Sequence, residues 1–321
     1  MQIGIAMFPN VDAPAPGRLG RMIEDRGLES LWFAEHSHLP IEAQPPEGST
    51  RGDWYSKTFD PFVAMTAAAA ATRTLKVATG VCLVPQRDPI HTAKEVATVD
   101  VLSDGRVIFG VGAGWNRLEM RNHGTDPKTR MRLLTERVQA MIEIWTNDVA
   151  EYHGRLVDFD LLQAWPKPVQ TPYPPIMVGG SGRTVEDRIL AFGDGWAPMI
   201  GGIEDQVFDR FARLQDRTDK PLELTASGPT PTARRSSDCG TAAHTGHLCG
   251  SRKTPQAGSA TATPNDSSTT SSQHLWLRAE GQLVWTCRRW QRINPAACGV
   301  HLSSRPAGSA DCFHATRHPL S

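Results

Sequence analysis

Short apolar segments alternate with amphipathic helical segments along the first 231 residues. The apolar runs fall at residues 3–8, 30–34, 76–84, 106–111, 175–178, 195–198 and 222–226. Runs that are apolar on both faces and separated by helices are typical of a parallel sheet covered by crossover helices. The pattern therefore predicts an α/β fold.

Two architectures share this alternation, the (β/α)8 TIM barrel and the doubly wound open sheet. Seven strands are countable, one fewer than the eight that close a barrel. Polar and glycine-rich residues recur after successive strands, as expected where barrel loops gather on one rim. We therefore predict a TIM barrel with an insertion at about residues 151–173, whose last strand–helix unit is missing or scrambled.

The sequence changes character after about Pro231. Five of the six cysteines and none of the nine methionines lie beyond it, and its isoleucine content falls to Ile293. Such a segment lacks the aliphatic side chains whose burial offsets the entropy of ordering a chain. We predict an incomplete barrel domain at residues 1–231 and a low-complexity, disordered tail at residues 232–321. The edges of the first and seventh strands would then remain unpaired.

The overall composition excludes several classes of protein. The formal net charge is +0 and the pI is about 7.2, so no nucleic-acid partner is expected. The N-terminus has no basic n-region, and no stretch approaches the ~18 apolar residues of a membrane span. We expect a cytoplasmic protein with a small-molecule substrate and no membrane partner, and the sequence leaves a homodimer open.

Metal chemistry is not predicted. Cys239, His244, His247 and Cys249 have the composition of a zinc site. They lie in a tail that supplies Cys and His throughout, so their grouping carries little weight.

His36 follows directly after the second predicted strand, which places it at the mouth of a barrel. A histidine there can donate a hydrogen bond to a bound ring or exchange a proton with it. The alternative interpretation is a solvated loop histidine.

Three glycines, Gly110, Gly112 and Gly114, lie at the end of the fourth predicted strand. Their spacing is G-x-G-x-G rather than the G-x-G-x-x-G of dinucleotide-binding folds. They indicate either the close approach of a flat ligand to the backbone or a tight turn.

Gly179, Gly180 and Ser181 end the fifth predicted strand and lead into a helix expected from Thr184. Small residues there leave backbone N–H groups accessible, and the dipole of the helix favours an anion. Late loops on the same rim often bind phosphate in barrels. The segment indicates a site for a phosphorylated cofactor tail.

Several motifs in register resemble the bacterial luciferase-like monooxygenase superfamily, and most closely its branch that depends on the deazaflavin coenzyme F420. These are residues 84–90 (VPQRDPI) with Ala93-Lys94, 102–106 (LSDGR), 110–115 (GVGAGW) and 178–180 (VGG). The resemblance covers residues 1 to about 231. It is specific for the family but not for the substrate.

This resemblance implies a barrel with a flavin-type ring across its strand ends and hydride transfer at C5 of that ring. It also implies a cis peptide bond between Gly80 and Val81, behind the ring. Glu35 and His36 match the position that contacts the deazaflavin and are the predicted catalytic residues. The predicted cofactor-binding residues are Gly80, Val81, Gly110, Gly112, Gly114, Gly179, Gly180 and Ser181. We expect Trp54 and Trp115 to line the substrate pocket.

Three functions follow as hypotheses. The first is an oxidoreductase that transfers a hydride between reduced coenzyme F420 and a small organic substrate. The second is a monooxygenase that uses FMN and molecular oxygen. The third is an inactive product of a frameshift, which keeps the motifs without a complete barrel.

A frameshift near Pro231 would explain the tail, because reading a GC-rich gene out of frame enriches Arg, Ser, Thr, Gly, Pro, His and Cys. We predict that the neighbouring frame of the gene encodes an acidic and aliphatic helix, an apolar strand and a second helix. Nucleotide sequencing checks this directly. If no frame has that pattern, the tail is a genuine extension, and proteolysis is expected from about residue 228 onward.

Overall fold

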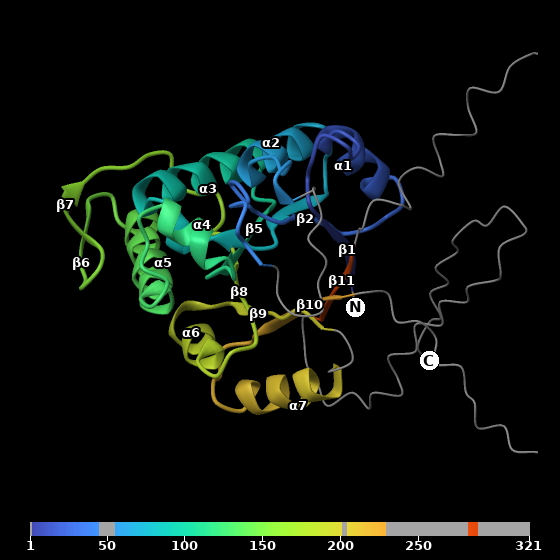
Figure 1. Cartoon of the computed structure of the whole chain (residues 1–321). Coiled ribbons are helices and arrows are strands. Elements are labelled where there is room, and N and C mark those ends of the chain that lie inside the picture. The colour runs from blue at the N-terminus through green and yellow to red at the C-terminus, as the bar shows by residue number, and fades with distance from the viewer. Residues whose placement is uncertain (1, 45–54, 201–203, 229–281, 288–321) are drawn as a thin grey trace, which may run out of the picture. The chain divides into compact units, whose positions relative to one another are not determined.

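The computed structural model describes residues 2–44, 55–200, 204–228 and 282–287 (Figure 1). These residues belong to one compact unit formed by Met1–Thr230 and Trp276–Gln291. The rest of the tail lies outside the described residues. The expectation of a disordered tail therefore stays a prediction for that part of the chain.

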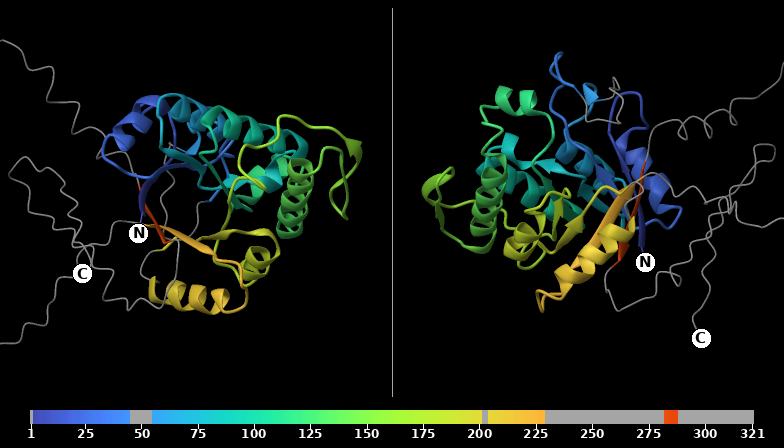
Figure 2. Two further views of the ribbon diagram at one scale, coloured as in Figure 1. Left: turned by 180° about the vertical axis from the view of Figure 1, so that it is seen from behind. Right: turned by 60° about the horizontal axis from the view of Figure 1, so that its bottom comes forward.

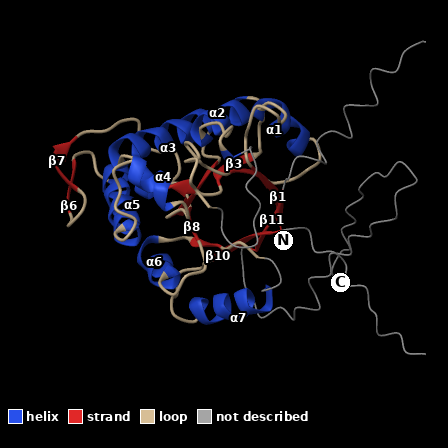
Figure 3. Ribbon diagram, viewed as in Figure 1, coloured by secondary structure: helices blue, strands red, loops and turns tan. Residues whose placement is uncertain are grey.

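A ring of paired strands forms the centre of the unit. Its members are β1 (Gln2–Met7), β2 (Ser30–Phe33), β3 (Lys76–Thr79), β5 (Val107–Gly112), β8 (Ile176–Gly179), β9 (Gly195–Ala197), β10 (Glu223–Gly228) and β11 (Gln282–Cys287). Neighbours from β1 through β10 pair in parallel, in the order β1–β2–β3–β5–β8–β9–β10. The strands form the inner layer and the helices lie outside them (Figure 3). The predicted barrel is confirmed.

The closure of the ring differs from the expectation. β11 pairs antiparallel with β1 from Ala6 to Gln2 and with β10 from Gly228 to Leu224. The prediction that these two strand edges remain unpaired is therefore wrong. The short apolar stretch in β11 is easily missed in a polar tail. An extended segment of a few residues is nevertheless enough to hydrogen-bond to the unpaired backbone edges of two strands. An eighth strand of the usual kind would run parallel to its neighbours.

The third barrel strand is interrupted. β3 and the two-residue β4 (Cys82–Leu83) both pair with β5, and the peptide bond between Gly80 and Val81 that separates them is cis. The structure thus has the cis bond that the family resemblance implies. The chain continues from β4 into the short 3-10 helix η2 (Val84–Gln86) and then into α3.

The helices begin where the sequence places their caps. The Asp60 carboxylate accepts hydrogen bonds from the N–H groups of Phe62 and Val63, and Asp88 accepts one from His91. Each aspartate is followed by proline in the first turn, where the missing N–H costs nothing. The helices are α1 (Pro16–Glu24), α2 (Pro61–Ala70), α3 (Pro89–Ser103), α4 (Arg117–Asn122), α5 (Arg130–Thr146), α6 (Val185–Phe192) and α7 (Glu204–Gln215).

The insertion forms an antiparallel hairpin of β6 (Ala150–His153) and β7 (Asp158–Leu162). Two further views show this hairpin at the periphery, beyond α5 and away from the strands of the barrel (Figure 2). The insertion therefore adds to the outside of the barrel and supplies no side chain to the site described below.

Apolar side chains fill both layers of the structure. Trp32, Ala78, Ile108 and Met177 form a separate cluster, one residue from each of the four successive barrel strands β2, β3, β5 and β8, and side chains of this kind fill the interior of a barrel. A larger cluster joins the outer faces of the strands to the helices. Successive residues of one strand belong to the two clusters in turn, which explains why the strands are apolar on both faces.

Closure by β11 gives a testable prediction. Val284 pairs with Gly4 on one side and Ser227 on the other, so a proline there removes an N–H group from the middle of the sheet. Val284→Pro should lower the free energy of unfolding by about 1–3 kcal/mol in urea titrations, the cost of an unmet buried hydrogen bond. Val284→Thr keeps the N–H and β-branched shape and should stay near the original stability. Equal stability of the two variants would contradict the pairing of β11.

Candidate active site

The carboxyl ends of the parallel strands bring distant segments to one rim of the barrel. Glu35 and His36 follow β2, Trp115 follows β5, and Gly180 and Ser181 follow β8. The structure therefore places the two main sequence-predicted groups, the acid–histidine pair and the glycine-rich loop, on the same rim.

His36 lies in an aromatic cage and is only 6% exposed. Its ring stacks with Phe8 at a centroid distance of 6.1 Å and meets the edges of Tyr55 and Trp115 at 4.9 and 5.6 Å. Tyr55 and Trp115 also contact each other at 5.9 Å. The cage fixes the plane of the imidazole, so the interpretation of His36 as a solvated loop residue is wrong.

A carboxylate that the sequence did not reveal holds His36 in place. Glu119 on α4 is fully buried, and its Oε2 lies 2.8 Å from Nδ1 of His36. Burial alone would raise the pKa of Glu119, but the hydrogen bonds from the His36 ring and from the N–H of Ser37 hold it below the usual 4.5. Glu119 is therefore ionised, Nδ1 carries a hydrogen, and Nε2 is left as the ring's free nitrogen.

Nε2 of His36 has no hydrogen-bond partner among the residues that the structure describes. This nitrogen can accept a proton from a bound molecule or return one to it. The buried carboxylate stabilises the charged imidazole that results, as second partners of functional histidines generally do.

Glu35 is placed differently from His36. One carboxylate oxygen accepts the N–H of Leu83 at 2.6 Å, and the other accepts Nε–H of Arg87 at 2.5 Å. Both oxygens are thus engaged in tying the end of β2 to the end of β4. A direct contact between Glu35 and a cofactor ring stays a prediction.

Arg87 is the central residue of the contacts that join the ends of β2 and β4. Its guanidinium also binds the carboxylates of Asp60 and Glu95 and lies 4.8 Å from the centroid of the Phe62 ring. Burial alone would lower the pKa of Arg87, but the surrounding negative charges raise it above its ordinary value. The group is permanently charged and joins β2, α2 and α3 below the rim.

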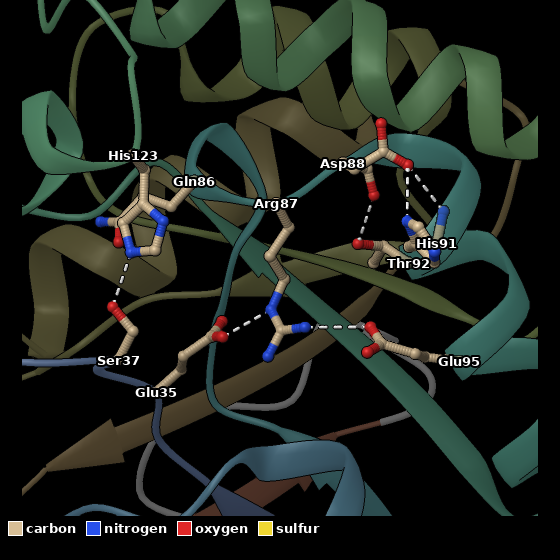
Figure 4. A pocket seen from close by; sticks show the side chains of 9 residues that line it. All are labelled: Glu35, Ser37, Gln86, Arg87, Asp88, His91, Thr92, Glu95 and His123. Atoms are coloured by element: carbon tan, nitrogen blue, oxygen red, sulfur yellow. Dashed lines mark hydrogen bonds and ion pairs between the residues drawn. The ribbon is translucent and has the colours of Figure 1, made fainter.

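A pocket of about 350 Å³ opens beside these residues (Figure 4). It is lined by Glu35, Ser37, Gln86, Arg87, Asp88, His91, Thr92, Glu95 and His123. His36 and the aromatic cage do not line it, so this pocket adjoins the predicted ring site and is not the same space.

Glycines of the fourth and fifth barrel strands pack against Val81 and Thr79, on either side of Gly80. A Cβ on Gly112 would lie 2.4 Å from Val81 Cγ2, and one on Gly179 would lie 2.9 Å from Val81 Cγ1. A Cβ on Gly110 would lie 2.0 Å from the Thr79 carbonyl oxygen. These glycines are therefore required by close packing around the cis bond, and contact with a ring remains a prediction for them.

Two other predicted glycines have backbone conformations that favour glycine. Gly114 has φ +74° and Gly180 has φ +93°. No atom lies within 4 Å of the Cβ position of Gly180, so the backbone there faces open space. Gly80 approaches the side chain of Trp32 instead, at 3.2 Å from its Cβ position.

The loop after β8 presents donors for an anion. Among the described residues, the N–H groups of Ser181 and Gly182 donate to no backbone carbonyl. The guanidinium of Arg210 holds the loop from below by binding the carbonyl oxygens of both residues, at 2.7 and 3.0 Å. The loop is thus anchored through its acceptors and leaves its donors available beside the start of α6.

Two side-chain amide nitrogens near the cage, Gln86 Nε2 and Asn116 Nδ2, are buried and have no protein partner. Trp115, one of the two predicted pocket residues, is part of the cage, and Trp54 lies outside the described residues. No group of His, Cys, Asp and Glu within the described ranges could hold a metal ion. None of the helices described there is long and apolar enough to cross a membrane.

Comparison with known proteins identifies the family. Residues 9–280 match the family model described as luciferase-like monooxygenase. The chain belongs to this family. The Mycobacterium tuberculosis (strain ATCC 25618 / H37Rv) protein Rv0953c is 40% identical over 202 residues, which are 61% of this chain and 71% of that protein.

Two relatives of this luciferase-like protein carry names that state a cofactor. An FMNH(2)-dependent dimethylsulfone monooxygenase of Pseudomonas putida is 34% identical over 44% of this chain and 40% of its own length. An F420-dependent glucose-6-phosphate dehydrogenase of Amycolatopsis mediterranei is 29% identical over 56% of this chain and 51% of its own length. The chain thus spans about half or less of each.

Solved structures share the fold of this family member. The monooxygenase RslO1 of Streptomyces bottropensis has a TM-score of 0.57 at 22% identity, covering 67% of this chain and 65% of that one. The coenzyme F420-dependent tetrahydromethanopterin reductase of Methanopyrus kandleri has a TM-score of 0.51 at 20% identity, covering 67% and 60%. At this level of identity the likeness concerns the fold alone.

Proposed function

We propose that the protein is an oxidoreductase that uses coenzyme F420 to move a hydride to or from a small organic substrate. Its family consists of flavin-type and F420-dependent oxidoreductases and monooxygenases, as the names of its relatives indicate. The observation that carries the proposal is the caged His36–Glu119 pair on the same rim as the donor-rich loop at Ser181 and Gly182.

The residues present fit a planar ring with an anionic tail. Val81, flanked by Gly112 and Gly179, gives the ring an apolar support, and Gly180 leaves space beside it. The free N–H groups of Ser181 and Gly182 suit a phosphate, which prefers backbone donors at a helix start. The buried amide nitrogen of Asn116, next to Trp115 of the cage, has no partner among the described residues and suits a carbonyl oxygen of such a ring.

In this proposal His36 handles the proton and the deazaflavin supplies or accepts the hydride. Nδ1 remains bound to Glu119, and Nε2 takes a proton from a substrate hydroxyl or gives one to a substrate oxygen. The aromatic cage of Phe8, Tyr55 and Trp115 keeps water away from the charged imidazole.

A second candidate is an FMN-dependent monooxygenase. The relative from Pseudomonas putida, which is 34% identical in the shared region, carries that cofactor in its name. The same residues on the rim would bind FMN in this case, because FMN also combines a flat ring with a phosphate. The two candidates therefore differ in the cofactor and in the use of oxygen.

Cofactor titration separates the candidates. We expect purified full-length protein to bind oxidised F420 saturably, with quenching of the deazaflavin fluorescence, and to bind FMN more weakly. Tight FMN binding with oxygen consumption by the reduced complex would reverse the assignment. A protein that melts without a cooperative transition and binds neither cofactor would be the inactive product of the third hypothesis.

Two carboxamide variants test the proton-handling role. Glu119→Gln removes the charge beside His36 and should lower kcat/KM by about 10–100-fold, the usual effect of losing such a partner. Glu35→Gln should mainly lower the melting temperature, because Glu35 binds Leu83 and Arg87. An equal loss of kcat/KM in a stably folded Glu35→Gln protein would instead support the ring contact that the family resemblance implies.

A further inference from the structure

A hydrogen-bond chain leads from the pocket of Figure 4 to the His36–Glu119 pair. Ser37 Oγ lies 2.7 Å from Nε2 of His123, 2.8 Å from Nδ1 of His38 and 3.4 Å from Oε1 of Glu119. Ser37 also donates its backbone N–H to the same oxygen of Glu119, at 3.0 Å. Ser37 and His123 line the pocket, so the outer end of the chain meets solvent.

We propose that Ser37 and His123 are positioning residues that set the strength of the Glu119–His36 hydrogen bond according to the protonation of His123. This inference rests on the proposed function, in which His36 handles the substrate proton. Neither residue touches the predicted ring site, and both act through Glu119.

The direction of each hydrogen bond follows from one amide. Asn122 Nδ2 lies 2.9 Å from Nε2 of His38, and an amide nitrogen can only donate. Nε2 of His38 is therefore the acceptor, and its Nδ1 carries the hydrogen that is donated to Ser37 Oγ. The single hydroxyl hydrogen of Ser37 is then free to point toward Nε2 of neutral His123.

Protonation of His123 reverses this arrangement. One proton from water in the pocket binds Nε2, which becomes a donor toward Ser37 Oγ. The oxygen then accepts from both histidines, and its own hydrogen turns toward Oε1 of Glu119, 3.4 Å away. Glu119 thereby gains a further donor and a nearby positive charge, so it attracts the Nδ1 hydrogen of His36 less strongly.

Burial and the charges around His123 set the pH at which His123 is protonated. Burial lowers the pKa of His123 below its ordinary value of 6.5, and the positive charge of Arg87, and of His38 once it is protonated, acts in the same direction, whereas Glu119 and Glu35 act in the opposite direction. His123 is therefore neutral at pH 7 and becomes charged at a lower pH than an ordinary histidine does. The Glu119–His36 bond is strongest above that transition and weakens as the pH falls through it.

Proton NMR of the cofactor-free protein with 15N-labelled histidine tests the inference independently of any catalytic activity. We expect the Nδ1 proton resonance of His36 to move upfield as the pH falls, with the midpoint of the His123 titration. Ser37→Ala should abolish that movement while His123 itself still titrates. His91→Gln is the matched control, because His91 lines the same pocket but is 88% exposed at its side chain and contacts Asp88 only.

A second variant covers the possibility that Ser37→Ala disturbs the loop. In His123→Gln the side chain at this position no longer titrates, so the His36 resonance should hold one position across the pH range in which His123 titrates in the unaltered protein. A His36 resonance that ignores the His123 titration, or that follows it equally in Ser37→Ala, would overturn the inference. If the NMR result holds but no cofactor binds, the proposed function has failed while the hydrogen-bond chain stands.

Discussion

An open edge of a parallel sheet exposes a row of backbone donors and acceptors, and a barrel forms only when both of its edges find a partner. In this protein β11 meets that requirement by pairing with β1 and β10 at once. Once the ring is closed, the carboxyl ends of β2, β5 and β8 share one rim. His36, Trp115 and the loop at Ser181 are far apart in the sequence and share this rim because β2, β3, β5 and β8 pair in parallel.

Two buried carboxylates at this rim, those of Glu35 and Glu119, make different kinds of contact. Glu35 binds Leu83 and Arg87 and thereby fixes the ends of β2 and β4 relative to each other. Glu119 binds His36 and Ser37 and thereby fixes the tautomer of the histidine. The contacts of the first carboxylate are structural, whereas those of the second orient the histidine to which we assign the proton chemistry in the proposed function. A single acid–histidine motif in the sequence does not distinguish these roles.

The sequence predicted the barrel and the position of His36 because these features depend on local pattern. Hydrophobic periodicity, capping residues and strand ends are all readable within a few residues. Glu119 was missed because it lies 83 residues from His36 and is joined to it only by the fold. Its place shortly after the fourth strand end was the available signal. β11 was missed because six residues of strand in a polar tail carry no periodicity long enough to detect.

A crystal structure of the protein with bound oxidised F420 tests the central claim most directly. The account predicts the deazaflavin ring against Val81, near His36, with the phosphate on the N–H groups of Ser181 and Gly182. A ring bound in the pocket lined by Arg87 and His123, or a phosphate away from the loop after β8, would contradict the account.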